Sequence, residues 1–410
     1  MYGGESANLN SAIGTLLVLV PWLTCRATTP DTHGTMTFLT VESPAALADL
    51  TPHWDDIPRG RRSPTDHLIW TQSCAETVAG GQALGVACVI SDDGLSAVAP
   101  LARPRRFSGQ THIGVQELGE PADLIFRDHD SLVALTRGLA RRKLPIVLPR
   151  IEADSPAIDA LLTAYSGRRI VVRRENRRCP YVALGGCGNG AESVLSKRMR
   201  SDLRRARRQA EKLGEVFAEV LSPRSAAEFV ELFDEAQRVE ASSWKGRTKT
   251  ALAADAERRA FFSAYGQRAV ARGILRMAFL RIDGQAVATQ IAVESDGRLW
   301  LLKIGYDHAF SRCSPGQLLM LESLEYACDS GLESLEFLGA DAPWTRRWTK
   351  TERETISLAI YPATPRGLVA LAGDFGPRVA RALAQRGRGA AGSLAATARG
   401  HALRRSRPCT

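Results

Sequence analysis

Residues 299–307 run Leu-Trp-Leu-Leu-Lys-Ile-Gly-Tyr-Asp, and after a short loop residues 314–319 run Ser-Pro-Gly-Gln-Leu-Leu. The first run is short, apolar and rich in residues that favour strands, so it predicts a β-strand. The second predicts the start of a helix, with Ser314 as the N-cap and Gln317 completing a capping box. Residues 335–338, Leu-Glu-Phe-Leu, then predict a second strand. This stretch therefore indicates a strand–helix–strand unit, and the rest of the fold is predicted outward from it.

The start of this helix is a candidate anion site. The first N–H groups of a helix have no partner within the helix, and they gather partial positive charge. Gly316 has no side chain to keep a ligand from the backbone, and Arg312 lies in the loop that leads to the helix. These features predict a phosphate at the helix start, and the alternative is a well-capped helix that binds nothing.

The length and charge of the chain limit the class of protein. A chain of 410 residues predicts two domains or one large duplicated one, and 44% apolar residues are enough for a proper core. The net charge of +10 is concentrated in two places: residues 197–212 carry +6, and residues 366–410 carry +8. A basic helix and a basic tail indicate an anionic polymer or a membrane surface as a partner, and they do not indicate specific DNA binding.

The cysteines and histidines are scattered. None of the eight cysteines forms a C-x-x-C motif, and no pair of histidines has metal-ligand spacing. The sequence therefore predicts neither a disulfide framework nor a metal site. A reducing cytoplasm, with contact to the membrane surface as an alternative, is the expected location.

Two similar hairpins indicate a duplication. Asp93-Gly94 is followed by Ala97-Val98-Ala99, and Asp283-Gly284 is followed by Ala286-Val287-Ala288. Both turns lie between apolar strands and lead onward to a helix and a strand. The glycine-rich residues 185–190 predict the boundary between the two halves. The expected organisation is an N-terminal extension (1–35, with Met36 as an alternative start), two α/β units (36–188 and 189–362) and a basic tail (363–410).

Several motifs, in order, resemble a known family. They are Glu-Ala-Ser-Ser-Trp-Lys-Gly at 240–246, the hairpin at 283–288, Tyr-Asp at 306–307, residues 314–319, and Glu-Phe-Leu-Gly-Ala-Asp at 336–341. Over roughly residues 40–362 the chain resembles the GNAT-like acyltransferase domain of CelD-like proteins, named for bacterial cellulose-biosynthesis loci. More distantly it resembles Fem-type aminoacyl transferases, which carry two GNAT-like units in tandem.

The resemblance implies a fold and a reaction. The fold class is α/β (α+β), with tandem GNAT-like units that each hold a mixed, mostly antiparallel sheet flanked by helices. The reaction is transfer of an acyl group, in the first instance acetyl, from acyl-CoA to an amine or hydroxyl of an unknown acceptor, in polysaccharide or cell-envelope biosynthesis. A bulged strand at 300–306 would offer N–H groups to the thioester carbonyl, and the helix start at 314–318 would receive the pyrophosphate.

The resemblance also suggests candidate site residues, and each has a structural alternative. Relatives usually carry a Tyr-Lys pair in the loop after the last strand, where this chain has Trp344-Thr345. That difference puts any role of the lysine in doubt. The candidate catalytic residues are Asp307, Glu240 and Tyr306; the candidate acyl-CoA-binding residues are Arg312, Ser314, Gly316, Gln317 and Leu318; and the candidate acceptor-binding residues are Trp244, Lys245, Trp344 and Arg346.

Two alternatives to an acyl-CoA-dependent enzyme stay open. The first is an aminoacyl-tRNA-dependent transferase of the Fem type. The second is a catalytically idle GNAT scaffold that binds an anionic polymer through its basic helix and tail, because a fold does not fix a function.

Overall fold

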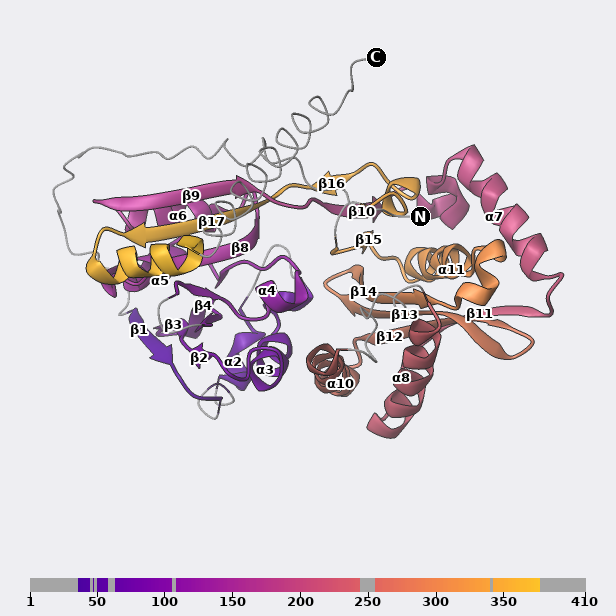
Figure 1. The fold of residues 1–410 in the computed structure, drawn as a ribbon, viewed down its shortest axis with the longest axis horizontal. Coiled ribbons are helices and arrows are strands. Elements are labelled where there is room, and N and C mark those ends of the chain that lie inside the picture. The colour runs from indigo at the N-terminus through magenta and orange to yellow at the C-terminus, as the bar shows by residue number, and fades with distance from the viewer. Residues whose placement is uncertain are drawn as a thin grey trace, which may run out of the picture.

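The computed structural model describes residues 36–44, 47, 50–57, 63–104, 108–243, 255–339 and 342–376. They form two α/β units side by side, the first drawn in indigo and magenta and the second mainly in orange (Figure 1). The predictions for residues 1–35 and for the tail beyond residue 376 lie outside the described residues. Each unit holds mixed sheets flanked by helices, so the predicted fold class is confirmed.

The first unit contains two sheets. Among the described residues, four strands pair in the order β1-β3-β4-β7 and six in the order β2-β5-β6-β8-β17-β9. Its elements are β1 (Thr37–Val41), α2 (Thr51–Trp54), η2 (Pro64–Asp66), α3 (Leu68–Glu76), β2 (Ala83–Leu84), β3 (Val86–Ser91), β4 (Gly94–Ala99), β5 (Leu101–Arg103), β6 (Gln110–His112), α4 (Val115–Leu118), β7 (Ile125–Phe126), α5 (His129–Arg141), β8 (Ile146–Glu152), α6 (Pro156–Ala164) and β9 (Arg169–Glu175).

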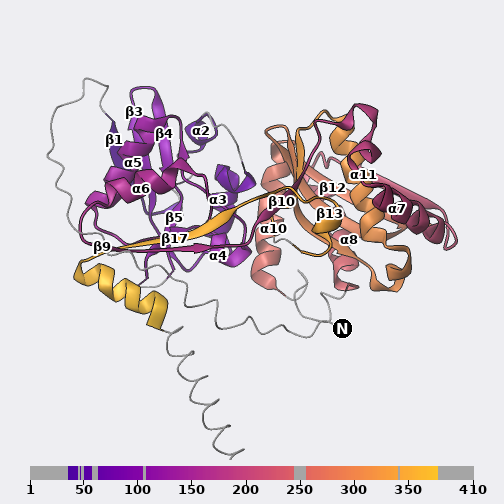
Figure 2. The same ribbon diagram turned by 90° about the horizontal axis from the view of Figure 1, so that it is seen from above.

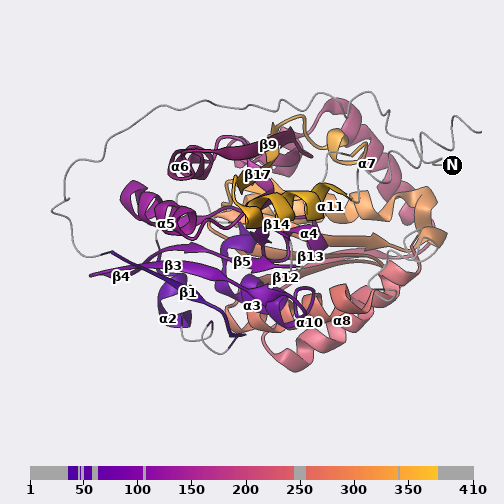
Figure 3. The same ribbon diagram turned by 60° about the vertical axis from the view of Figure 1, so that its left-hand side comes forward.

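The second unit is built on one sheet, whose described strands pair in the order β11-β12-β13-β14-β15-β10-β16. Helices α7 and α11 cover one face of this sheet, and α8 and α10 cover the other (Figure 3). The elements from here to the last strand are β10 (Cys179–Ala183), η3 (Cys187–Asn189), η4 (Ala191–Val194), α7 (Lys197–Ala210), β11 (Val216–Leu221), α8 (Ala226–Ala241), α10 (Ala256–Ala271), β12 (Leu275–Ile282), β13 (Gln285–Ser295), β14 (Arg298–Tyr306), η6 (His308–Cys313), α11 (Pro315–Asp329), β15 (Ser334–Glu336), η7 (Thr345–Arg347), β16 (Glu352–Arg353) and β17 (Thr355–Pro362).

Local sequence explains where the main helices begin. Ser196, Ser225 and Asp255 each accept a hydrogen bond from a backbone N–H of the first turn that follows, at the starts of α7, α8 and α10. Short oxygen-bearing side chains are the preferred N-caps because they satisfy amides that the helix itself leaves without partners. The order of helices that the sequence predicts in the second half follows from these caps.

The two hairpins have corresponding neighbours on one side and different neighbours on the other. In each unit an antiparallel edge strand (β1 or β11) flanks the hairpin (β3–β4 or β12–β13). In the second unit, β14 and the parallel strand β15, which follows α11, continue the sheet of the hairpin. In the first unit, β4 pairs with β7 instead, and β6 with its parallel partner β8 lies in the six-stranded sheet. The turn at Asp283-Gly284 has positive φ at both residues, as a two-residue hairpin turn requires.

The units exchange strands with each other. β10 precedes the predicted boundary, yet it pairs with β15 and β16 of the second unit. β17 was expected to close the second unit, but it lies between β8 and β9 of the first unit. The two connections run past each other between the units (Figure 2). The placement of β17 in the second unit is therefore wrong, because its apolar residues complete the core of the first unit.

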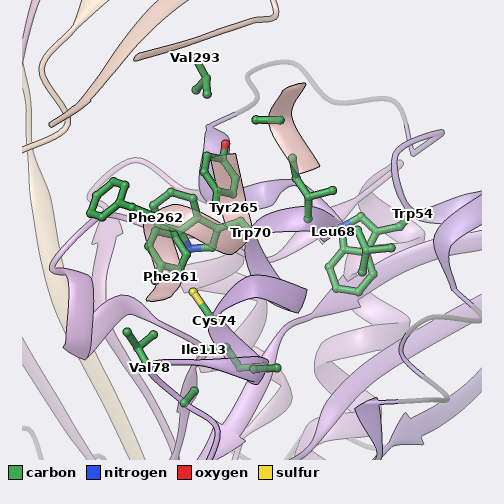
Figure 4. Packing of buried hydrophobic residues seen from close by; sticks show 14 of the residues in the cluster. Trp54, Leu68, Trp70, Cys74, Val78, Ile113, Phe261, Phe262, Tyr265 and Val293 are labelled. Atoms are coloured by element: carbon green, nitrogen blue, oxygen red, sulfur yellow. The ribbon is translucent and has the colours of Figure 1, made fainter. Parts of the chain in front are cut away.

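The units also share one hydrophobic core. Helix α3 of the first unit packs on α10 of the second, with the Trp70 ring 4.8 Å from Phe261 and 5.1 Å from Tyr265 in edge-on contacts (Figure 4). Buried aromatic pairs of this kind add about 0.5–1.5 kcal/mol each beyond the apolar area that they bury. A residue at this seam is therefore held rigidly by both units.

One cysteine prediction is wrong. Cys187 and Cys328 form a disulfide between η3 and the last turns of α11, across a sequence separation of 141. The spacing along the chain gave no sign of this pair, because only the fold brings the two residues together.

Candidate active site

The central strand of the second sheet is bulged. In the pairing of β13 with β14, Ile291 lies opposite Lys303 and Ala292 lies opposite Leu301, so Leu302 is the extra residue. β14 pairs with β15 only over Arg298–Trp300, and no other described strand covers that edge of β14 beyond this point. A bulge re-aims side chains and ends regular pairing, so β14 leaves an open edge at the seam between the units.

A cavity of about 240 Å³ opens at this edge, and we call it the bulge cavity. Both units line it. The first unit supplies Trp70, Leu118 and Glu120; α10 supplies Arg258 and Phe262; β14 supplies Leu301, Leu302, Lys303 and Ile304; and the segment after β15 supplies Phe337, Gly339 and Trp344. A mainly apolar lining with a few polar groups is typical of a small-molecule site.

A buried ion pair lies behind the bulge. Glu240, only 2% exposed on the last turn of α8, pairs with Lys303 at 3.1 Å between Oε1 and Nζ. A Cβ on Gly305 would lie 3.1 Å from both Cα and Cβ of Glu240, so glycine lets α8 approach β14 closely. Sequence reasoning singled out Glu240 as a candidate base, and the structure places it as the partner of a lysine that lines the cavity.

Glu120 brings a carboxylate into the cavity from the first unit. Its Oε2 atom is buried and has no hydrogen-bond partner among the described residues. Burial raises the pKa of Glu120 to about 7, although the cations of Arg150, Arg258, Arg177 and Lys303 act in the opposite direction. A carboxyl group with such a pKa can exchange a proton near neutral pH. The sequence gave no signal for Glu120, which lies in a loop between a glycine and a proline.

Arg150 fixes the two walls of the cavity relative to each other. This arginine of β8 is 4% exposed, and it donates to the carbonyl oxygens of Gly119, Leu338 and Gly339 at 2.5, 3.1 and 2.9 Å. Leu338 has a φ of 52°, which costs a non-glycine residue on the order of 1–3 kcal/mol. The Arg150 guanidinium therefore holds the strained turn at Leu338 next to Gly119, the residue that precedes Glu120. Sequence reasoning also missed Arg150.

The start of α11 differs from the prediction. Ser314 adopts a left-handed backbone (φ 51°, ψ 53°), and its side chain caps no amide, so the predicted capping box with Gln317 is wrong. N-cap side chains reach the first amides from an extended backbone, which Ser314 does not have. Its carbonyl oxygen instead accepts from the N–H groups of Gln317 and Leu318, at 2.9 and 3.3 Å.

The geometry around α11 still leaves an approachable helix start. Gly316 is half-buried, and a Cβ there would meet the Tyr306 ring at an ordinary 3.5 Å. Arg312 is exposed in η6 just before the helix, whereas Leu318 is buried in the core of the second unit. The first turn of α11 carries no acidic side chain.

The remaining predicted site residues lie in different places, and one of them lines the bulge cavity. The Asp307 carboxylate caps η6 by accepting from the N–H of Ala309 at 2.9 Å. Trp344, 39% exposed, lines the bulge cavity and packs edge-on against Phe337 with ring centroids 5.3 Å apart. Arg346 is exposed on η7. Trp244 and Lys245 lie outside the described residues.

A second cavity, the acidic cavity, lies on the other side of the segment around Leu338. It has a volume of about 390 Å³, and carboxylates outnumber its single cation, Arg353. Burial raises the pKa of Asp123 in its lining to about 7. Its other carboxylates are Asp66, Glu152, Asp154 and Glu336.

Two features are absent from the described residues. No helix among them is both long and apolar enough to cross a membrane. No group of three or more His, Cys, Asp or Glu side chains among them could hold a metal ion.

Comparison with solved structures shows the fold. The C-terminal DUF2156 domain assigned to a lysylphosphatidylglycerol synthetase of Agrobacterium fabrum is 13% identical with a TM-score of 0.51, over 81% of this chain and 97% of that one. A conserved protein of unknown function from Bacteroides thetaiotaomicron VPI-5482 is 13% identical with a TM-score of 0.51, over 79% of this chain and 99% of that one. A tandem GNAT protein from the clavulanic acid biosynthesis pathway is 12% identical with a TM-score of 0.43, over 80% of this chain and 98% of that one.

Comparison with sequences gives a similarity to one family model over part of the chain. No curated protein matches the chain. Residues 197–346 match the family model Acetyltransf_6, described as an acetyltransferase (GNAT) domain. This range holds α7, the bulged β14, α11 and one wall of the bulge cavity. Residues 197–346 are therefore similar to a GNAT acetyltransferase domain, and they lie within a chain of two α/β units.

Proposed function

We propose that the protein transfers an acyl group, in the first instance acetyl, from acyl-CoA to an amine or hydroxyl of an acceptor. The observation that carries this proposal is the open, bulged edge of β14 in the wall of a cavity between the units. Backbone N–H groups on such an edge can stabilise the oxyanion that forms when a nucleophile attacks a thioester carbonyl. A small cavity also brings the acceptor into reach of that carbonyl.

The residues of α11 fit the phosphates of acyl-CoA. Gly316 leaves the first turn open, Arg312 stands exposed before it, and no acidic side chain lies there. The four residue steps from Leu302 to Tyr306 span about 13 Å of strand. A donor with its phosphates at α11 and its thioester at the bulge would therefore lie extended along β14. Acyl-CoA supplies an activated acyl carbon, and this chain supplies binding, orientation and backbone hydrogen bonds.

The corresponding helix of the first unit does not suit an anion. Asp128 caps α5 by accepting from the N–H of Ser131 at 2.8 Å, and Asp130 stands in its first turn. Those carboxylates already occupy the positive end of the helix and would repel phosphate. The donor is therefore expected at the second unit, which leaves the first unit to face the acceptor.

The test compares two substitutions at one position. Gly316→Asp should weaken binding of acetyl-CoA by at least about tenfold, because a carboxylate repels the phosphates, while folding persists because helix N-termini tolerate Asp. Gly316→Ala is the matched control, since its methyl group makes only an ordinary contact with Tyr306. Isothermal titration of both variants and the parent measures the effect. Equal affinity of Gly316→Asp and the parent would place the donor elsewhere.

An aminoacyl-tRNA donor of the Fem type is the second candidate, and one feature favours it. Helix α7 packs against α11 and η6, and its exposed Lys197, Arg198 and Arg208 have no ion-pair partner within the described residues. Such a surface suits a polyanion or an anionic membrane. Incubation with acetyl-CoA and with an aminoacyl-tRNA pool decides between the donors. Binding of RNA without consumption of either donor would indicate an idle scaffold.

The physiological setting is also part of the proposal. The motifs shared with CelD-like proteins support an acceptor from polysaccharide or cell-envelope biosynthesis. The cytoplasm, at the membrane surface when the basic elements are engaged, stays the proposed location, and the Cys187–Cys328 disulfide is the observation that opposes it, because disulfides are rare in a reducing compartment.

A further inference from the structure

We propose that the bulge cavity takes the acceptor as a primary amine on an apolar or aromatic body, and that Glu120 is the residue that accepts the proton from its nitrogen. This inference rests on the proposed acyl transfer, and it names the acceptor class and a catalytic residue that comes from the unit opposite the GNAT-like domain.

The polar atoms of the cavity point to Glu120 as the group that meets the ligand. Lys303 is paired with Glu240, and Arg258 with Asp255 at 3.3 Å. Oε2 of Glu120, by contrast, is buried without a hydrogen-bond partner among the described residues. A buried acceptor atom left unbonded costs about 1–3 kcal/mol, and an ammonium or amine N–H at this position would recover that cost.

The rest of the lining describes the body that carries the nitrogen. Trp70, Phe262, Phe337 and Trp344 surround the cavity with aromatic rings, and Leu118 and Leu302 add aliphatic surface. Aromatic walls favour a flat or apolar group, so of the two settings proposed above they favour an apolar cell-envelope amine over a polysaccharide. The charged donors in the lining are the side chains of Lys303 and Arg258, which already have carboxylate partners.

The position of Glu120 suits proton transfer during attack. The amine nitrogen bonds to the acyl carbon, the carbon–sulfur bond breaks, and coenzyme A leaves as a thiolate. The proton from nitrogen passes to Glu120 and then to the thiolate or to water, so that amine and thioester give amide and thiol. Burial raises the pKa of the Glu120 carboxyl to about 7, which matches the strength that this transfer needs at neutral pH.

One hydrogen bond and one chain restraint position the backbone of Glu120. Arg150 binds the carbonyl oxygen of the preceding Gly119 at 2.5 Å, and Pro121 follows Glu120 directly. The carboxylate is therefore placed from the first unit while β14 comes from the second, and neither unit alone contains both parts.

The experiment uses the full chain with acetyl-CoA and 2-phenylethylamine as probes, and ethanolamine and spermidine as polar amines. Glu120→Gln keeps the shape and removes the base. Asp123→Asn is the matched control, because the Asp123 carboxyl is also buried and its pKa is also raised to about 7, but it lines the acidic cavity. Formation of N-acetyl-2-phenylethylamine should fall by about 10²–10⁴-fold in Glu120→Gln and change little in Asp123→Asn. At a fixed concentration of the unprotonated amine, the rate of the parent should rise with pH through about 7, and Glu120→Gln should lose that rise.

Calorimetry at pH 8 measures binding of the amine in the absence of a donor. This measurement separates the proposed acceptor site from the proposed acyl-CoA donor. If acetyl-CoA does not bind but 2-phenylethylamine binds at least tenfold better to the parent than to Glu120→Gln, the proposed donor is wrong and the acceptor site stands. If the parent turns over and Glu120→Gln matches it in rate and pH profile, the inference is overturned and the acyltransferase stands. Preference for ethanolamine or spermidine, or no amine binding at all, would overturn the acceptor class.

Discussion

Arg150 in the first unit donates a hydrogen bond of 3.1 Å to the carbonyl oxygen of Leu338, which lies 188 residues away in the strained turn after β15. This contact joins the wall that carries Glu120 to the wall that follows the bulged strand. Its consequences for stability can be measured directly.

Replacement of Arg150 should destabilise the fold. Arg150→Ala leaves three carbonyl oxygens without their donor, and the free energy of unfolding should fall by about 3 kcal/mol. The free energy of unfolding of Arg150→Lys should lie between those of Arg150→Ala and the parent, because a lysine keeps the charge but not the planar guanidinium. Urea denaturation measures both. Arg178→Ala, at an exposed ion pair, serves as the control and should leave the unfolding midpoint unchanged.

Gly305 should tolerate no side chain. The methyl group of Gly305→Ala would press on Cα and Cβ of Glu240 at 3.1 Å, so α8 must shift from β14 and stability should fall by about 1–3 kcal/mol. Gly316→Ala, with ordinary contacts, should change stability by less than about 0.5 kcal/mol. Thermal unfolding of the two variants is the measurement, and equal melting temperatures would contradict the close packing of α8 on β14.

The disulfide should contribute to stability. It closes a loop of 141 residues between η3 and α11, and removal of such a crosslink typically costs about 2–4 kcal/mol. Dithiothreitol should therefore lower the melting temperature of the parent. Cys187→Ser should already have the lower value and should not respond to the reductant. A parent that is indifferent to dithiothreitol would show that the crosslink stabilises nothing.

Two buried carboxyl groups should make stability fall as the pH rises. The pKa values of Glu120 and Asp123 are both raised to about 7 by burial, so between about pH 4 and pH 7 the folded state binds protons that the unfolded state has released. Their contribution falls across that window and is constant above it. The double variant Glu120→Gln/Asp123→Asn should lose this dependence. The difference between parent and variant in unfolding free energy, measured from pH 4 to pH 8, isolates the effect from other groups.

Local sequence predicted local structure well. The turn at Asp283-Gly284 and the succession of β14, α11 and β15 follow from nearby residues, because backbone preferences and helix starts act within a few positions. The predicted capping box at Ser314 is wrong for an equally local reason, because the backbone of Ser314 is left-handed. Of the residues predicted for the site, Glu240 lies behind the bulge cavity as the partner of Lys303, and Trp344 lies in its lining.

The remainder depends on contacts between the halves of the chain. Glu120 and Arg150 belong to the first unit, and nothing in the residues around them shows that they face β14. The same holds for β17 and for the Cys187–Cys328 pair, whose partners are far away in sequence. A single sequence records which segments are apolar, but it does not record which sheet each segment joins.

The exchange of β10 and β17 has a mechanical consequence. The two units are tied together by both crossings and by the core at the seam, so swinging them apart would separate Trp70 from Phe261 and Tyr265. Enzymes that close one domain over another gate their substrates by that motion. Here the opening between the units is a fixed aperture, and admission of an acceptor must be governed by side chains at its rim, of which Trp344 is one.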